Sequence, residues 1–167
     1  MQSHYAKLLR AMLTASLLLV TSFAVPVAAG VLEDAGIAYN QRNFAEAVKL
    51  YRRAADQGYA EAQSFLGVLY KEGTAVAQDY FEAAKWFRRA ADQGDSNGQF
   101  LLGSLYASGK GVPRDYVQAH VWFNLAAQQG DDSAKALRNF MEEVRLSTAL
   151  IAEAQKLARE WKPKKER

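Results

Sequence analysis

The chain has 167 residues, a formal net charge of +3 and no cysteine. This length fits one domain plus a targeting segment, and the lack of cysteine excludes disulfides and the common cysteine-containing zinc sites. Two of the 21 basic residues, Lys7 and Arg10, lie in the first ten positions, so the remainder is close to neutral and lacks the basic surface that nucleic-acid binding requires.

The first 29 residues are typical of an export signal. Their start is basic, residues 11–25 are apolar, and small residues surround Ala29. This order predicts a secretory signal peptide, residues 1–29, that is cleaved after Ala29. An uncleaved membrane anchor is the alternative, because residues 11–29 approach the length of a membrane-spanning helix. Either way we expect the rest of the chain to be exported, to a periplasm or to the medium, and cleavage leaves it without stable membrane insertion.

A repeated pattern follows the signal. The sequence LGVLYKEGTAVAQDYFEAAKWFRRAADQG begins at Leu66, and LGSLYASGKGVPRDYVQAHVWFNLAAQQG begins 36 residues later at Leu102. A shorter copy, AGIAYNQRNFAEAVKLYRRAADQG, covers residues 35–58. Self-similarity at a fixed period of this length indicates a repeat architecture, in which stacked units bury a shared core.

Each copy predicts two helices. Tyr80, Ala83, Ala84 and Phe87 follow the spacing of one buried helical face. The second helix of each copy begins with a predicted capping box, in which one side chain accepts a backbone N–H and a residue three positions later returns the contact. Glycine in a left-handed conformation is expected to end each second helix. The boxes pair Asn43 with Glu46, Asp79 with Glu82 and Asp115 with Gln118, and the glycines are Gly58, Gly94 and Gly130.

Six repeat positions are expected to be structural. Gly67 and Gly103 lie inside the first helices, where glycine costs about 1 kcal/mol relative to alanine. We interpret them as places where a neighbouring helix approaches closely, with tyrosine and tryptophan rings filling the surrounding space. The six positions are Gly67, Tyr70, Trp86, Gly103, Tyr106 and Trp122.

The pattern LGxLYxxG, a loop and DYxxAxxWFxxAAxQG resembles the Sel-one-like repeat, a tetratricopeptide-related helical hairpin. The resemblance implies an all-α fold, a right-handed superhelical solenoid of stacked antiparallel helix pairs, in an exported bacterial protein. The implied repeat domain spans residues 30–161. Its hairpins are expected at about 31–58, 59–94 and 95–130, followed by a capping pair at 131–161.

The end of the chain departs from the repeat. Arg138, Asn139 and Glu142 stand where the preceding copy has Leu, Gly and Tyr, which predicts a terminal helix pair with a more polar outer face. The tail 162–167 is basic, and we expect it to be solvated and frayed.

Gly109, Lys110 and Gly111 raise the question of a phosphate-binding loop. Such a loop needs serine or threonine directly after the lysine, whereas Gly111 follows Lys110, and no strand leads into the segment. We therefore interpret it as the connection between the two helices of its hairpin. One repeat earlier Ala75 and Ala77 replace Gly111 and Pro113, which leaves the turn geometry there open.

The remaining polar residues form no catalytic constellation. A lone histidine on a helix, His120, is expected to be a partly exposed surface residue without a role. Four aspartates near helix junctions are explained by capping and the helix dipole rather than by a cation site. Four arginines suit helix C-termini on a solvated face, with a basic stripe for an acidic partner as the alternative. We predict no catalytic, cofactor-binding or metal-binding residue; the residues considered are Asp92, Asp95, Asp131 and Asp132, and Arg52, Arg53, Arg88 and Arg89.

The resemblance implies a non-catalytic, exported scaffold or adaptor that binds a partner protein or peptide in the concave groove of the solenoid. The first helices of the hairpins are expected to line this groove. For Phe100, packing between hairpins is an equal alternative to partner binding. The predicted groove residues are Glu61, Ser64, Val68, Lys71, Asn97, Phe100, Ser104 and Phe140.

Two other functions stay open from the sequence. Some cysteine-rich relatives have been linked with β-lactam binding or hydrolysis, which makes a cell-wall- or β-lactam-directed hydrolase one alternative. The chain lacks their cysteine pairs and the S-x-x-K nucleophile motif of that chemistry. The other alternative is a structural subunit that assembles with its own copies into a homo-oligomer.

Overall fold

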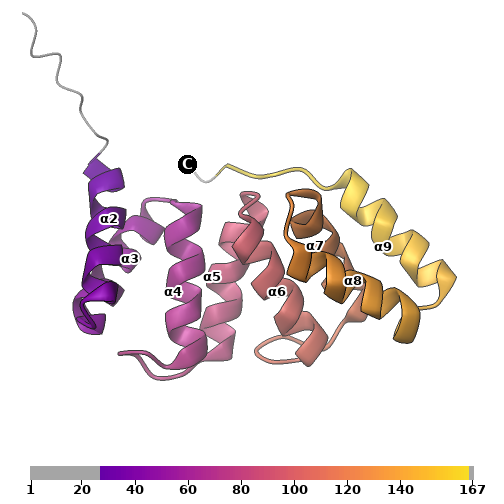
Figure 1. Cartoon of the computed structure of the whole chain (residues 1–167), viewed down its shortest axis with the longest axis horizontal. Helices are drawn as coiled ribbons and strands as arrows, with labels where there is room; N and C mark the ends of the chain where they lie inside the picture. Colours follow the sequence, from indigo (N-terminus) through magenta and orange to yellow (C-terminus); the bar gives the residue numbers. More distant parts are fainter. Residues whose placement is uncertain (1–26, 166–167) are drawn as a thin grey trace, which may run out of the picture.

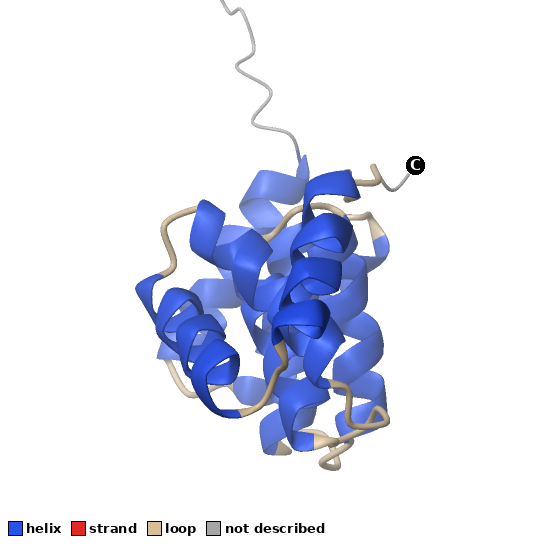
Figure 2. Cartoon of the chain, turned by 90° about the vertical axis from the view of Figure 1, so that its right-hand side faces the viewer, coloured by secondary structure: helices blue, strands red, loops and turns tan. Residues whose placement is uncertain are grey.

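The computed structural model describes residues 27–165, and within them all regular structure is α-helical (Figures 1 and 2). Of the predicted export signal, residues 1–26 lie outside the described part, and residues 27–29 form the first turn of α2. No described helix is both long enough and apolar enough to span a membrane. The helices are α2 (Val27–Asn40), α3 (Phe44–Asp56), α4 (Ala60–Glu72), α5 (Tyr80–Asp92), α6 (Ser96–Ser108), α7 (Tyr116–Gln128), α8 (Asp132–Val144) and α9 (Thr148–Glu160).

The helices stack as antiparallel pairs in one continuous row (Figure 1). Each of the pairs α2–α3, α4–α5 and α6–α7 is a hairpin, and the second helix of each also packs on the first helix that follows. Seen along the row, the helices overlap in a narrow stack (Figure 2). The predicted all-α solenoid and its first three hairpins are therefore present.

The helix starts are capped as predicted, but only by half of each capping box. Asp79 Oδ1 accepts from the backbone N–H groups of Phe81 and Glu82, at 2.9 and 3.0 Å. The predicted contact from the Glu or Gln side chain back to the N–H group of the capping residue was wrong. Instead, the backbone N–H of Asp79 donates to Tyr70 O, and that of Asp115 donates to Tyr106 O. Because the preceding helix satisfies the N–H of the capping residue, no side chain is needed there. Each N-cap thus also fixes the loop within its hairpin.

The glycines inside the first helices do mark close approaches, but a phenylalanine and not a tyrosine or tryptophan makes them. A Cβ atom at Gly67 would lie 2.5 Å from the Phe87 ring, and one at Gly103 would lie 2.9 Å from the Phe123 ring. Both rings are fully buried. The aromatic ring and the glycine belong to the two helices of one hairpin, so this contact sets how closely those helices pack.

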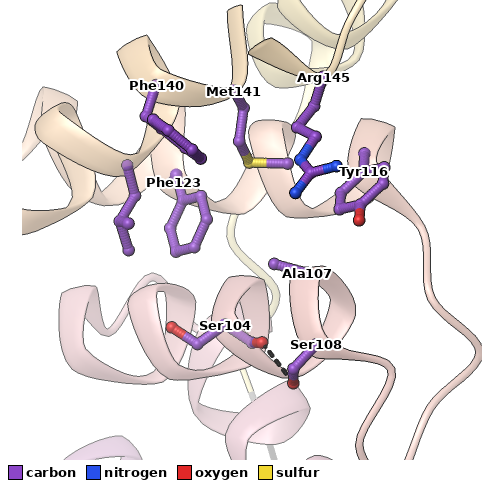
Figure 3. Close-up of a pocket in the computed structure, with 9 residues that line it drawn as sticks. Ser104, Ala107, Ser108, Tyr116, Phe123, Phe140, Met141 and Arg145 are labelled. Carbon is purple, nitrogen blue, oxygen red and sulfur yellow. Dashed lines mark hydrogen bonds between the residues drawn. The ribbon is translucent and has the colours of Figure 1, made fainter.

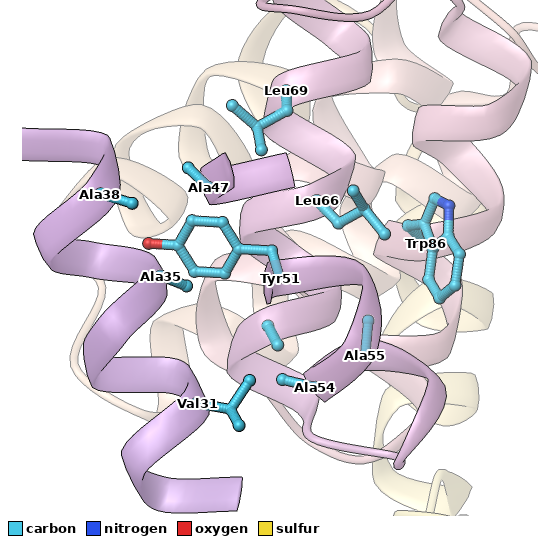
Figure 4. Close-up of a cluster of buried hydrophobic side chains, with 11 residues drawn as sticks. Val31, Ala35, Ala38, Ala47, Tyr51, Ala54, Ala55, Leu66, Leu69 and Trp86 are labelled. Atoms are coloured by element: carbon cyan, nitrogen blue, oxygen red, sulfur yellow. The ribbon is translucent and has the colours of Figure 1, made fainter. Parts of the chain in front are cut away.

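The core is shared between hairpins (Figure 4). In the first cluster Tyr51 of α3 joins Leu66 of α4 and Trp86 of α5, which both belong to the next hairpin. Tyr70 contacts both the first and the second cluster, and Tyr106 contacts both the second and the third. No hairpin encloses a core of its own, and stacking supplies the stability, as a repeat architecture requires.

Two buried glutamines join neighbouring hairpins through a polar ladder. Gln63 Nε2 donates to Ala55 O, and Gln63 Oε1 accepts from Gln93, at 3.1 and 2.8 Å. One repeat later Gln99 bonds Ala91 O and Gln129 in the same way, at 3.4 and 2.8 Å. The ladder satisfies helix C-terminal carbonyl groups inside the stack. The sequence analysis missed it, although the two glutamines are 36 residues apart.

The C-terminal end differs from the predicted capping pair. Helix α9 packs on α7, as α8 does, and makes little contact with α8. Its buried Ala154 and Ala158 join the cluster that contains Trp122. Besides polar residues, both helices expose large apolar side chains: Leu137, Phe140, Val144, Leu150 and Leu157.

The described part of the tail, residues 162–165, is exposed as expected and also contacts the stack. The backbone N–H of Lys164 donates to Asp92 O at 2.6 Å, and Lys164 Nζ lies 3.4 Å from the Asp92 carboxylate. Trp161 packs edge-on against Trp122 with ring centroids 6.2 Å apart. In Figure 1 the tail runs back from α9 along one side of the stack. These contacts tie the end of the chain to α5 and α7.

Candidate protein-binding groove

Three adjacent pockets line the first helices of the hairpins. Pocket A lies between the first halves of α4 and α6, pocket B between their second halves, and pocket C between α6 and α8. Pockets A and B share Leu101, and pockets B and C share Ser104 and Ser108, so the three form one groove with α6 as its floor. Pocket A consists of Glu61, Ser64, Phe65, Val68, Asn97 and Leu101; pocket B of Lys71, Glu72, Gln78, Tyr80, Phe100, Leu101, Ser104, Leu105, Ser108 and Lys110. Pocket C consists of Ser104, Ala107, Ser108, Tyr116, Phe123, Leu137, Phe140, Met141 and Arg145.

The eight predicted groove residues all fall within these pockets. They are not equally available, because Ser64 is buried and its hydroxyl donates to Asp95 at 2.5 Å. Phe100 lies with its ring 5.9 Å from that of Phe123 and is only partly exposed, so packing accounts for much of its surface. Phe140 is 51% exposed and is the most accessible apolar side chain of the groove.

Pocket C has a volume of about 330 Å³ and mostly apolar walls (Figure 3). Phe140 and Met141 of α8 and Phe123 of α7 face Ser104 and Ser108 of α6 across it. The two serine hydroxyls donate to carbonyl groups of their own helix, Ser104 to Phe100 O and Ser108 to Ser104 O, both at 2.9 Å. Because these donors are already satisfied, the pocket suits an apolar side chain.

Arg145 closes one end of pocket C. Its guanidinium lies 5.7 Å from the centre of the Tyr116 ring, toward which it points in Figure 3. Such a cation over an aromatic face is held electrostatically while it stays open to solvent. The sequence analysis did not single out this residue, since Arg145 stands where the preceding repeat has Gly109.

Two of the four arginines of the second helices, Arg52 and Arg88, contact the following hairpin. Arg52 donates to the Tyr70 hydroxyl and Arg88 to the Tyr106 hydroxyl, one repeat apart. Each arginine also lies over the ring of the same tyrosine, at 5.7 and 5.5 Å. They thereby lock each hairpin to the next, and the conserved spacing explains why Tyr70 and Tyr106 recur within this chain.

His120 was expected to be partly exposed, and it is fully buried. Its Nε2 lies 2.7 Å from Oε1 of Glu142 on α8. Within the repeat, His120 and Glu142 occupy the positions of Ala84 and Tyr106. Relative to the preceding repeat, α7 carries a larger residue (His120 for Ala84) and α8 a smaller one (Glu142 for Tyr106), so the two changes compensate. The sequence pattern of one helix alone does not reveal this. The pair joins α8 to α7.

The Gly109–Gly111 loop is structural, as predicted. A Cβ atom at Gly111 would collide with the carbonyl group of Tyr80 at the start of α5. Gly111 also has a φ of 69°, where L side chains are strained. One repeat earlier, Ala75 adopts the same left-handed conformation with φ 56°, although it replaces glycine.

Within residues 27–165 no three His, Asp or Glu side chains gather as metal ligands would. The aspartates near the helix junctions have other partners in the structure. Asp95 and Asp131 cap α6 and α8, and Asp92 binds Lys164.

The repeat is also found by comparison with known families. The Sel1 repeat pattern matches residues 35–59, 60–95 and 96–131, which make up more than half of the chain. The chain belongs to the Sel1 repeat family. Proteins of this family are generally non-catalytic repeat scaffolds and commonly mediate protein–protein interactions. No curated protein sequence matches the chain.

Solved Sel1 repeat structures have the same fold. The chain is similar to c5321, a protective antigen of uropathogenic Escherichia coli with an SLR fold, at 33% identity over 80% of this chain and a TM-score of 0.75. A Sel1 repeat protein from Oxalobacter formigenes matches 78% of the chain at 31% identity, with a TM-score of 0.67. Helicobacter pylori cysteine rich protein B matches 55% at 27% identity, with a TM-score of 0.53. The chain spans 29% of the E. coli protein, 56% of the O. formigenes protein and 69% of the H. pylori protein.

Proposed function

We propose that this Sel1 repeat chain is an exported, non-catalytic scaffold that binds a partner protein or peptide in the groove formed by pockets A, B and C. The observation that supports the proposal is the continuity of these pockets along α4, α6 and α8. A protein partner gains most of its binding energy from a few buried apolar or aromatic anchors. Pocket C offers such a site, with Phe140 exposed at its rim.

Export to a periplasm or to the medium belongs to the proposal and rests on the basic, apolar and small-residue order of residues 1–29. Expression of the full chain fused to a reporter that is active only outside the cytoplasm tests it. Reporter activity that disappears when Leu17–Leu19 are replaced by charged residues supports export. Equal activity of both forms contradicts it.

The groove is tested by cross-linked affinity capture from the native envelope fraction, with full-length wild type and a Phe140→Asp variant as bait. Phe140 is half exposed, so its replacement leaves the core intact. Phe81→Asp is the matched control, since Phe81 is 60% exposed on α5 and lies outside the three pockets.

We expect Phe140→Asp to lose the captured partner while Phe81→Asp keeps it, with equal helicity of the three proteins by circular dichroism. Retention of the same partner by Phe140→Asp would show that binding does not use the groove. Loss in both variants would point to a general loss of apolar surface instead of a site.

Self-assembly is the second candidate function, and exposed apolar residues on α8 and α9 favour it. Leu150 and Leu157 of α9 are 39% and 38% exposed and lie outside pockets A to C. Sedimentation velocity of the wild type and of a Leu150→Lys, Leu157→Lys variant tests it. A concentration-dependent dimer that the variant abolishes supports self-assembly, and a wild-type monomer throughout contradicts it.

A further inference from the structure

Pockets B and C are the same site, built twice one repeat apart. Leu101, Ser104 and Leu105 of α6 line pocket B, and the residues that follow them by 36 positions line pocket C. The same relation joins the walls contributed by the preceding helices. The equivalent pairs are Lys71 and Ala107, Glu72 and Ser108, Tyr80 and Tyr116, Leu101 and Leu137, Ser104 and Phe140, and Leu105 and Met141.

Each of the two pockets ends in a cation that lies over a tyrosine ring. Lys110 Nζ is 5.0 Å from the centre of the Tyr80 ring in pocket B, and Arg145 Cζ is 5.7 Å from that of Tyr116 in pocket C. The two tyrosines are the first residues of α5 and α7 and therefore occupy the same place in successive hairpins. The attraction between each cation and its tyrosine ring favours a position of the charge at the groove.

Both cations are open to an anion from outside. Lys110 and Arg145 are exposed, and in the described residues neither one forms an ion pair with the chain. Gly111, the next residue, lies against the carbonyl group of Tyr80, so the backbone of the loop that carries Lys110 packs on the start of α5. Two unpaired cations in one groove are complementary to two anionic groups on one ligand.

The repeat sets the spacing of those groups. Helices in direct contact lie about 8–10 Å apart, and α4 and α6, which line pocket B together, are in contact. We take one repeat step along the groove to be of that order. In an extended polyproline-II segment each residue rises about 3.1 Å and every third side chain points the same way. Two carboxylates three residues apart therefore match Lys110 and Arg145, and a neighbouring apolar side chain reaches pocket C.

We infer that the groove recognises an extended acidic segment of a partner protein, with carboxylates at positions i and i+3 held by Lys110 and Arg145 and a bulky apolar side chain beside the second carboxylate in pocket C. This inference rests on the proposed groove function and adds the chemistry of the partner. It also gives Lys110 a role beyond the connection between the two helices of its hairpin.

A set of fluorescent peptides tests the inference by anisotropy against the full chain expressed with its own export signal. The peptides are proline-rich, carry one phenylalanine, and place two aspartates at separations from one to five residues. We expect the separation of three to bind most tightly, and Lys110→Gln and Arg145→Gln each to weaken it by about 3- to 10-fold. Lys135→Gln, on α8 but outside the three pockets, is expected to bind as the wild type does.

The charge-conserving variants Lys110→Arg and Arg145→Lys are expected to retain most of the affinity, which separates a charge effect from misfolding. A parallel selection from a random peptide library tells the inference apart from the groove function. The inference is overturned, and the groove function kept, if the selected peptides contain no paired acids, bind less tightly to Phe140→Asp and bind the two glutamine variants as tightly as the wild type. Selected peptides that bind every groove variant equally overturn both.

Discussion

The glycine at position 67 gives the sharpest test of how this solenoid is packed. A Cβ atom at Gly67 would lie 2.5 Å from Cε1 and 2.6 Å from Cδ1 of the fully buried Phe87 ring. Carbon atoms in good contact are about 3.5–4.0 Å apart. Gly67→Ala therefore forces the ring, or the two helices of the hairpin, to move by about an ångström. Overpacking of this kind typically costs about 1–3 kcal/mol.

Gly36 provides a matched control inside the same protein. It occupies the equivalent place in the first hairpin, but a Cβ atom there would meet only the Tyr51 hydroxyl, at 3.9 Å. Both substitutions gain the helix preference of alanine over glycine, about 1 kcal/mol. That gain cancels in the difference between the two variants. We expect Gly36→Ala to be as stable as the wild type or more so, and Gly67→Ala to be less stable than Gly36→Ala by about 1–3 kcal/mol.

Urea unfolding followed by circular dichroism measures this difference through the midpoint and the slope of each transition. A double variant, Gly67→Ala with Phe87→Leu, checks the cause, because a smaller side chain opposite the new methyl group relieves the collision. We expect it to lose less stability than the sum of its two single changes. Equal stability of Gly67→Ala and Gly36→Ala would refute the role assigned to the glycine–phenylalanine contact.

Three further predictions concern other parts of the stack. His120→Ala removes the buried partner of Glu142 and opens a cavity, and we expect a loss of about 2–4 kcal/mol in the same urea assay. Removal of residues 162–167 breaks the Lys164–Asp92 contacts at the surface, so a stability loss below about 1 kcal/mol is expected, with faster hydrogen exchange at the end of α5 as its signature. Burial, and secondarily the charge of Glu61, raises the pKa of Tyr51 above its ordinary value. As the pH rises, the Tyr51 hydroxyl of the unfolded chain therefore loses its proton before that of the folded chain, and the free energy of unfolding falls as the pH rises through 10 and above. A Tyr51→Phe variant is expected to show a shallower fall. An equal fall in both proteins would contradict the burial of the hydroxyl.

The parts of the fold that the sequence predicted are those that depend on local or periodic information. The 36-residue period places equivalent residues in equivalent surroundings, so the hairpins, the N-cap residues and the closing glycines could all be derived before the structure was known. Each of these features involves a few neighbouring residues whose conformational preferences act alone. Which aromatic ring faces Gly67 depends instead on how two helices rotate about one another, and the spacing does not fix that rotation.

The burial of three polar residues did not follow from the sequence, and their partners explain why. Gln63, Gln99 and His120 are hydrophilic in isolation, so a sequence pattern assigns them to the surface. In the structure each one is fully buried, because a residue about 22 to 30 positions away supplies its hydrogen bond. The burial of a polar group depends on that partner. Recurrence of glutamine at a separation of one repeat was the available signal.

The C-terminal end shows how a break in the repeat creates the groove's distinct chemistry. Strict repetition would place a glycine at position 145 and a lysine at position 146, where the chain has Arg145 and Leu146. Instead α8 ends without a left-handed glycine, and its C-cap residue is Arg145. The arginine thereby reaches Tyr116, as Lys110 reaches Tyr80, although the two cations are out of register by one residue. The same break replaces Ser104 by Phe140 and Leu105 by Met141, which turns pocket C into the apolar counterpart of pocket B. Repetition therefore sets the spacing of Tyr80 and Tyr116, over which the two cations lie. The departure from repetition gives the two pockets different contents, so that a ligand has one orientation in which its apolar side chain enters pocket C.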